Sequence, residues 1–247
     1  MSEPVLLRPA WPAPANVRAA STTRIGGVSR GDFASLNLGA RTADEPDAVV
    51  RNRVLLAATL QLPAEPAWLE QVHGTRVVAA RDHAAAAADA AWSKTAGEVC
   101  VVLTADCLPV LFCDRAGTVV AAAHAGWRGL VGGVLEATIA ALKSPPTSLL
   151  AWIGPGIGAT AFEVGDEVKQ VFVAADPDAE GCFEPSPAGR WLADLEGLAR
   201  RRVAGAGVEG VYGGGWCTYS DAERFYSHRR AASTGRMASL IWLGSGS

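Results

Sequence analysis

The chain alternates between short apolar runs and segments with helical spacing. Short runs rich in Val and Leu are typical of buried strands, and apolar residues three and four positions apart indicate amphipathic helices. We therefore expect strands at 76–80, 99–103, 108–113, 118–123, 149–153, 208–212 and 237–243. Helices are expected at 46–60, 129–142, 163–173 and 192–203. Because strands and helices are interleaved, the pattern predicts an α/β or α+β fold with mixed sheets flanked by helices.

Two of the expected helices have recognisable features. In the first, Asp44 is expected to cap the N-terminus and Pro46 to lie in the first turn. Val50, Val54 and Ala57 then recur at the spacing of one helical face. The residues that share a face in the second are Val131, Val134, Leu135, Thr138 and Leu142.

Length and composition fit a globular chain with a large core. The 247 residues are 49% hydrophobic and 19% charged, which excludes a disordered chain. No long Gly/Ser or Pro linker divides the sequence, so we expect a single domain over 1–247, acting as a monomer. With 22 Lys and Arg against 25 Asp and Glu, the net charge is −3, which argues against a protein held on nucleic acid mainly by phosphate contacts.

Cysteine usage and the N-terminus indicate where the chain works. Five cysteines, an odd number without a CxxC pair, favour a reduced intracellular protein. The first residues lack the basic start and continuous apolar run of a signal peptide. The most apolar window, Val99–Cys113, is 15 residues long and contains Asp106, so it is too short and too polar to span a membrane. We therefore expect a cytoplasmic protein without membrane contacts.

Only four histidines occur, so their settings are informative. His73 precedes a glycine in QVHG, Cys107 lies in the polar break TADCLP between two apolar strands, and His124 ends an apolar strand before GWRG. Two imidazoles and one thiolate suit Zn²⁺ with a fourth position open to water or substrate, and copper is the alternative metal. A buried thiol beside two hydrogen-bonded histidines fits the same spacing. Asp106 is a candidate proton carrier or histidine orienter, or it only caps the turn.

Arginines form a second group of candidates. Arg24 precedes GGVS, Arg128 lies at an expected helix N-terminus, and Arg229 and Arg230 follow FYSH. Guanidinium groups bind phosphate, and a helix N-terminus with glycines offers free backbone N–H groups to an anion. We expect these arginines to bind phosphate or substrate, Arg128 above all because it follows His124 by four residues. For each of them the alternative is ordinary surface charge.

Longer words of this sequence resemble the YfiH family, whose members are called laccase-domain or polyphenol oxidoreductase proteins and also purine nucleoside phosphorylases. The words are TTRIGGVSRGDFASLNLG (22–39), QVHG (71–74), TADCLPVLF (104–112), HAGWRG (124–129), GPGIG (154–158), FEVG (162–165), CTYSDAERFYSHRR (217–230) and TGRM (234–237). The resemblance runs from about Arg18 to Leu243. Three departures lie outside the three metal-ligand candidates: Gly156 in place of Ala, His228 in place of Tyr, and Trp92-Ser93-Lys94 in place of a Val-Thr-polar stretch.

This resemblance implies a fold, a site and an activity. The fold would be one α/β domain with mixed sheets. The family's histidine–cysteine–histidine site falls on His73, Cys107 and His124, which would be both catalytic residues and metal ligands. The implied activity is phosphorolysis of adenosine, inosine and 5′-methylthioadenosine, with some deamination of adenosine. Copper-dependent oxidation of phenols and a role in peptidoglycan fidelity have also been attached to the family.

Other functions remain open from the residues. A cysteine hydrolase or amidase would use Cys107 as nucleophile and His124 or His73 as base. A multicopper oxidase needs many imidazoles, and this chain has four histidines and no His-x-His pair, so it can hold at most a single copper on the three donors. A metal-binding protein without catalytic activity, working in envelope maintenance, is a further alternative. The deaminase motifs H-x-E and P-C-x-x-C are absent, so deamination would use a different arrangement.

Overall fold

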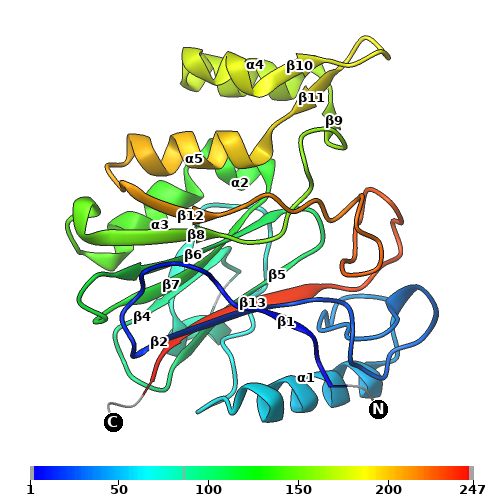
Figure 1. The fold of residues 1–247 in the computed structure, drawn as a ribbon, viewed down its shortest axis with the longest axis vertical. Helices are drawn as coiled ribbons and strands as arrows, with labels where there is room; N and C mark the ends of the chain where they lie inside the picture. Colours follow the sequence, from blue (N-terminus) through cyan, green and yellow to red (C-terminus); the bar gives the residue numbers. More distant parts are fainter. Residues whose placement is uncertain (1–2, 86, 245–247) are drawn as a thin grey trace.

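The computed structural model describes residues 3–85 and 87–244, and Figure 1 shows how they are arranged. The strands are β1 (Leu6–Leu7), β2 (Val17–Thr22), β3 (Val77–Ala79), β4 (Ala90–Ser93), β5 (Val99–Thr104), β6 (Leu108–Asp114), β7 (Val120–Ala125), β8 (Leu149–Ile153), β9 (Glu163–Val164), β10 (Phe183–Pro185), β11 (Trp191–Ala193), β12 (Gly210–Gly213) and β13 (Met237–Leu243). The α-helices are α1 (Pro46–Leu60), α2 (Trp127–Gly132), α3 (Val134–Leu142), α4 (Asp166–Ala175) and α5 (Leu195–Gly205). Short 3₁₀ helices are η1 (Gly31–Phe33), η2 (Ala80–Ala85), η3 (Pro146–Ser148) and η4 (Pro177–Cys182).

These strands form three sheets. One has the order β1-β2-β13-β5 and is antiparallel throughout. The largest has the order β12-β8-β6-β7-β4-β3, with parallel pairs at its two edges and antiparallel pairs between them. The third, β10-β11-β9, is small and antiparallel. The mixed α/β class predicted from the sequence is confirmed.

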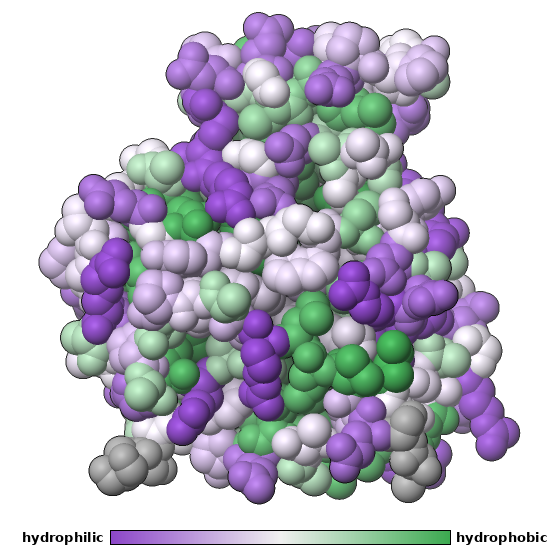
Figure 2. Space-filling model, in the orientation of Figure 1, coloured by the Kyte–Doolittle hydropathy of each residue, from purple (hydrophilic) through white to green (hydrophobic). Residues whose placement is uncertain are grey.

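The two larger sheets pack face to face, with helices on their outer faces. One apolar cluster lies between the sheets, a second joins the six-stranded sheet to α3 and α5, and a third joins the other sheet to α1. Figure 1 shows α1 at the bottom and α4 with β10 and β11 at the top. On the same face, Figure 2 shows apolar side chains gathered mainly in the lower half, near β1 and β13, and a narrower top.

Strands β6 and β7 carry the centre of the fold and lead into the site. Along β6, Val110 and Phe112 belong to the helix-side cluster, whereas Leu111 and Cys113 belong to the cluster between the sheets. A strand buried on both faces reads as a continuous apolar run, which is why the sequence pattern identified it. The neighbouring β7 is rich in alanine and places His124 near its end.

Helix α1 has the predicted limits, but the predicted cap is wrong. Its N-cap is Glu45, whose side chain makes no capping hydrogen bond. The Asp44 carboxylate instead accepts hydrogen bonds from Ser29 Oγ (2.6 Å) and Asn37 Nδ2 (3.0 Å). Asp44 therefore fixes mainly the preceding loop, and its other carboxylate oxygen accepts from the backbone N–H of Glu45 (2.9 Å).

The predicted face of α1 is also wrong. Val50 and Val54 are 59% and 63% exposed, while Val49 and Leu56 are buried together with Asn52. The Asn52 amide donates to Ser29 Oγ, Ser35 O and Asn37 O. Because a polar residue lies at the centre of the buried face, apolar spacing alone indicated the opposite side.

Other differences concern the ends of elements. The second predicted helix is divided into α2 and α3 at Gly133, whose φ of +98° ends the first and begins the second. Leu192 belongs to β11 rather than to the last helix, because the Asp194 carboxylate accepts from Gly197 N and caps α5 there. Strands β2 and β4 were not predicted. None of the described helices is both long and apolar enough to cross a membrane.

Candidate active site

Three segments that are distant in the sequence meet at one end of the central strands β6 and β7 of the six-stranded sheet. Cys107 lies directly before β6, and His124 lies near the end of β7, opposite Pro109 of β6. Antiparallel neighbours bring the beginning of one strand beside the end of the next, so the sheet itself places the thiol near the imidazole. His73 comes from the loop before β3, which the sheet joins through β4.

His73, Cys107 and His124 form a compact donor set. One nitrogen or sulfur atom from each lies within 4.8 Å of the others. His73 Nε2 is 3.7 Å from Cys107 Sγ, and the two imidazole rings meet edge to face with centroids 4.8 Å apart. The structure thus brings together the three residues selected from the sequence.

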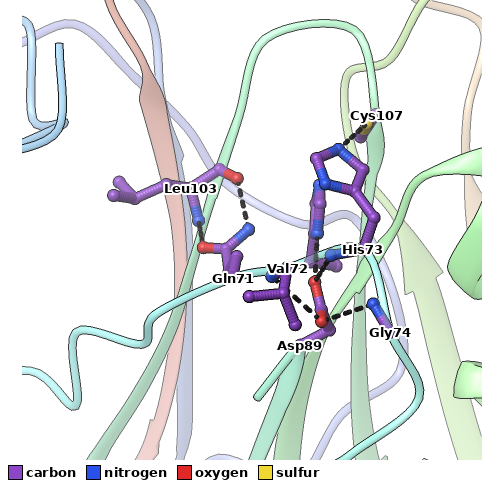
Figure 3. Close-up of polar contacts among 8 residues, drawn as sticks. Gln71, Val72, His73, Gly74, Asp89, Leu103 and Cys107 are labelled. Atoms are coloured by element: carbon purple, nitrogen blue, oxygen red, sulfur yellow. Dashed lines mark hydrogen bonds and ion pairs between the residues drawn. The ribbon is translucent and has the colours of Figure 1, made fainter. Parts of the chain in front are cut away.

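Asp89 holds both histidines in place, and Figure 3 shows its contacts with the loop of His73. Its Oδ1 accepts hydrogen bonds from His124 Nδ1 (2.8 Å) and from the backbone N–H of His73 (2.9 Å). Its Oδ2 accepts from the backbone N–H groups of Gly74 (2.7 Å) and Val72 (3.2 Å). Because an ionised carboxylate only accepts, His124 carries a proton on Nδ1, and Nε2 is the ring atom that it can offer to a metal.

Gln71 attaches the same loop to the neighbouring sheet. Its side-chain Nε2 donates to Leu103 O, and its Oε1 accepts from Leu103 N, both at 2.8 Å (Figure 3). The amide therefore pairs with β5 as a backbone segment would. With Asp89 on one side and β5 on the other, the position of His73 is fixed by two sheets.

The backbone at the site has two unusual conformations. His73 has φ +61° and Asp106 has φ +91°, a region that residues other than glycine adopt rarely. Such conformations persist where surrounding contacts determine them, and they are concentrated at functional sites. Gly126 is required for a different reason, since a Cβ there would lie 2.7 Å from His73 Cδ2 and 2.9 Å from Cys107 Sγ.

Electrostatics favour a charged pair between the thiol and an imidazole. Burial alone raises the pKa of Cys107, but His124 and His73 outweigh it and lower this pKa to about 6. Burial alone lowers the pKa of His124, but Cys107 and Asp89 raise it to about 9. The pKa of Asp89 is lowered against its own burial, by the hydrogen bonds from His124 and Gly74. At neutral pH the set therefore holds a thiolate.

The donor chemistry fits one zinc-type cation. Zinc distances of about 2.0 Å to nitrogen and 2.3 Å to sulfur place neighbouring ligand atoms roughly 3.5 Å apart, close to the 3.7 Å between His73 and Cys107. Three protein ligands leave one coordination position for substrate. A multicopper centre does not fit, because the chain has four histidines and the set above is the only such cluster among the described residues.

A cavity of about 940 Å³ opens over the donor set. Its wall contains the aromatic rings of Trp68, Trp127 and Phe162 and also several arginines. Guanidinium groups lie over each ring: Arg53 over Trp68 at 3.8 Å, Arg128 over Trp127 at 4.3 Å and Arg229 over Phe162 at 5.3 Å. The cavity thus offers flat surfaces and positive charge to a ligand.

Two of the four predicted arginines lie at the cavity. Arg128 and Arg229 line it. Arg24 instead donates to Ala34 O and Ala222 O, and Arg230 donates to the carbonyls of Thr218, Tyr219 and Phe225. Arg24 and Arg230 are outside this lining and bind backbone carbonyls, so their contact with phosphate stays a prediction.

Asp106 has a role that differs from orienting a histidine. Its Oδ1 accepts from Thr218 Oγ1 and its Oδ2 from the backbone N–H of Arg229, both at 2.6 Å. It thereby ties the segment 217–230 to the turn that contains Cys107.

Sequence reasoning missed Asp89, Gln71 and two arginines of the cavity wall, Arg53 and Arg236. Asp89 directly precedes β4, a four-residue strand that the apolar pattern did not reveal. Gln71 and Arg236 lie within the words QVHG and TGRM. The family resemblance of these words could have identified the two residues, whereas their residue types alone could not.

Comparisons with known proteins agree with this architecture. Residues 18–244 match the family described as multi-copper polyphenol oxidoreductase laccase. The chain is 57% identical to a purine nucleoside phosphorylase of Pseudomonas aeruginosa, covering 96% of this chain and 98% of the relative. It is 54% identical to the purine nucleoside phosphorylase YfiH of Escherichia coli, with the same coverage.

Solved structures show the same fold. A crystal structure of a Neisseria meningitidis protein matches with a TM-score of 0.93 at 53% identity, covering 97% of this chain and 99% of that one. YlmD from Geobacillus stearothermophilus matches with a TM-score of 0.86 at 31% identity, covering 94% and 93%. The chain therefore belongs to the family described as multi-copper polyphenol oxidoreductase laccase, the YfiH family that its sequence words indicated.

Proposed function

We propose that this protein is a purine nucleoside phosphorylase that cleaves adenosine, inosine and 5′-methylthioadenosine with phosphate, yielding the free base and ribose 1-phosphate, or its methylthio derivative. The observation that carries the proposal is the His73–Cys107–His124 set at a cavity lined by arginines and aromatic rings. The names of the relatives support the same activity. The cavity size suits a small ligand of nucleoside dimensions.

The reaction assigns tasks that these residues can perform. As the C–N bond breaks, its electron pair goes to the base and positive charge develops on the ribose, which a phosphate oxygen then captures at C1′. Trp127 and Phe162 offer surfaces for stacking the base, and Arg128 and Arg229 offer positive charge for phosphate or substrate. When bound at the three donors, zinc would supply Lewis acidity toward the departing base and, for deamination of adenosine, toward water.

Asp89 sets which ring nitrogen of His124 carries the proton. It holds the proton of His124 on Nδ1, which leaves Nε2 as the ring atom that can bind the metal. Cys107, held as a thiolate by the two histidines, supplies negative charge at the centre of the set. The five cysteines are all free, and a reduced Cys107 is what the proposed cytoplasmic site of action requires.

A cysteine hydrolase is the second candidate, favoured by the 3.7 Å between Cys107 Sγ and His73 Nε2 and by the low pKa of this thiol. Metal dependence separates the two. A chelator should inactivate the phosphorylase but leave a thiol hydrolase active.

The decisive experiment incubates the purified, metal-loaded protein with adenosine, with and without phosphate, and separates the products by chromatography. Adenine and ribose 1-phosphate formed only with phosphate would support the proposal. Inosine formed without phosphate would support deamination. No product from a folded, metal-loaded protein would contradict both activities and favour the hydrolase or a metal-binding role in peptidoglycan maintenance. Oxidation of a phenol with copper alone would favour the oxidase.

A further inference from the structure

Arg236 lies in the TGRM word, directly before β13, and the proposed function above gives it no role. It lines the same cavity as His73, Cys107 and His124. Its position is fixed from the backbone outward. The Arg236 N–H donates to Asn37 Oδ1 at 2.9 Å, and its side chain packs on Gly39 so closely that a Cβ there would lie 2.8 Å from Arg236 Cγ.

The guanidinium group of Arg236 is anchored through one nitrogen only. Its Nη1 donates to Thr234 O (2.9 Å) and Gly235 O (3.0 Å). Nε and Nη2 donate to no described residue, and no carboxylate of the described residues forms an ion pair with this arginine. By contrast, the neighbouring Arg41 is paired with Glu70 at 2.7 Å.

The position of Arg236 makes this lack of an anion costly. Burial lowers its pKa, and the negative charges of Cys107 and Asp106 act in the opposite direction. A guanidinium that has lost water without gaining a carboxylate partner is stabilised by an anion that enters from the cavity. Its two remaining donor nitrogens, Nε and Nη2, are adjacent and can form the paired hydrogen bonds that suit a phosphate.

Arg53 adds positive charge to the same wall. It donates from Nε (3.1 Å) and Nη2 (2.9 Å) to Leu38 O, next to the Gly39 on which Arg236 packs. It also stacks on Trp68 rather than pairing with a carboxylate. Two arginines that form no ion pair with a described carboxylate therefore lie beside the segment Leu38–Gly39 at the cavity wall.

We propose that Arg236, supported by Arg53, is the binding site of the attacking phosphate, and that Arg128 and Arg229 serve the nucleoside. This assignment rests on the proposed phosphorolysis. It also has a test that needs no turnover, since phosphate binding can be measured alone.

The test is calorimetric titration of the full, metal-loaded protein with inorganic phosphate. Arg236→Gln should weaken phosphate binding by about tenfold or more, the loss of a charge-assisted pair of hydrogen bonds. Arg41→Gln is the matched control, because it removes one positive charge from the same cavity at a residue already paired with Glu70, and should change the affinity by less than about threefold. Arg236→Lys keeps the positive charge but removes the paired Nε and Nη2 donors. It tests the assignment in the case that the glutamine variant does not fold.

Steady-state kinetics give a second readout. In Arg236→Lys, the KM for phosphate should rise by about tenfold while the KM for adenosine stays within about twofold. Unchanged phosphate affinity in both Arg236 variants would overturn the assignment, as would loss of phosphate binding in Arg128→Gln alone. If phosphate binding depends on Arg236 but no nucleoside is cleaved, the anion site stands and the proposed reaction fails. If the Arg236 variants cleave the nucleoside with an unchanged KM for phosphate, the proposed reaction stands and the assignment of the anion site to Arg236 fails.

Discussion

Asp89 joins the two histidines of the site through one carboxylate, by the side chain of His124 and the backbone of His73. Replacing it by Asn removes the charge. It also turns one carboxylate oxygen into an amide NH₂ group, which would face the two N–H donors that this oxygen now accepts from. We therefore expect Asp89→Asn to lower zinc affinity by about 10- to 100-fold, measured by competition with a chelator. Asp82→Asn, at an exposed ion pair with Arg81, is the control. Equal zinc affinity in Asp89→Asn and wild type would show that this carboxylate does not orient the ligands.

Cys107 differs from the other cysteines of the core in both access and charge. It lines the cavity, whereas Cys100 and Cys113 are fully buried and burial raises the pKa of each thiol, to about 12 for Cys113. Cys107→Ala should abolish turnover and leave the fold intact, while Cys113→Ala should cost only about 1 kcal/mol of stability and retain activity. Activity assays with urea denaturation test this. Equal loss of activity in both variants would mean that the thiol is structural.

Iodoacetamide gives an independent test of the same residue. Metal-free protein should be alkylated at Cys107 first, and zinc should protect it because a coordinated sulfur is not free to attack. Peptide mass spectrometry after short exposure, with and without zinc, identifies the modified thiol. Modification of Cys107 at the same rate in both samples would argue against coordination by this sulfur.

The three donor residues could be recognised from the sequence because histidine and cysteine are scarce here and lie at strand ends beside Gly or Pro. The residues that position them could not. Asp89 reaches His124 across 35 positions of sequence, and only the pairing of β4 with β7 brings them together. Similarly, arginine chemistry does not distinguish Arg230, which binds carbonyls, from Arg128, which lines the cavity.

At the scale of elements, the N-terminus of α2 is packed against the donor set. Gly126 is its N-cap, and a Cβ there would overlap His73 and Cys107. Gly126→Ala should therefore push the ligands apart and lower zinc affinity and activity by at least about tenfold. Gly205→Ala, at a helical position with nothing within 4 Å, is the matched control and should change neither. Normal zinc binding in Gly126→Ala would mean that the loop can move without loss of the site.

In helix α1, the polar residue Asn52 lies on the buried face, so apolar spacing did not identify this face. Leu56→Ala should destabilise the protein by about 2–5 kcal/mol, since Leu56 is fully buried against the first sheet. Val54→Ala should change stability by less than about 0.5 kcal/mol, because Val54 is 63% exposed. Urea denaturation of the two variants measures both. The reverse order would support the face inferred from apolar spacing alone.

The elements that could be predicted from the sequence are those with a regular pattern of apolar residues. Strands with a continuous apolar run, such as β6 and β13, were located within a residue or two of their observed ends. Strands β10 and β11 have three residues each, which is too short for an apolar pattern to develop. They form only because β11 pairs with both β10 and β9. Tertiary contact, not local propensity, defines them.

At the scale of the molecule, a metal at the site would connect parts of the chain that fold against different surfaces. The loop of His73 is attached to β5, Cys107 directly precedes β6, and His124 lies near the end of β7. An unfolded chain does not hold these donors together, so a ligand of the native set stabilises the folded state by mass action.

Adding zinc to chelator-treated protein should therefore raise the Tm, with a gain of about 2.7 kcal/mol when free zinc is about 100 times its Kd. Differential scanning calorimetry measures the shift. His73→Ala removes one ligand, and its loop stays attached because Asp89 binds the backbone N–H of this residue rather than the ring. The variant should thus fold but gain much less Tm from zinc. A rise equal to that of wild type would place the stabilising zinc elsewhere on the molecule and remove the metal from the proposed active site.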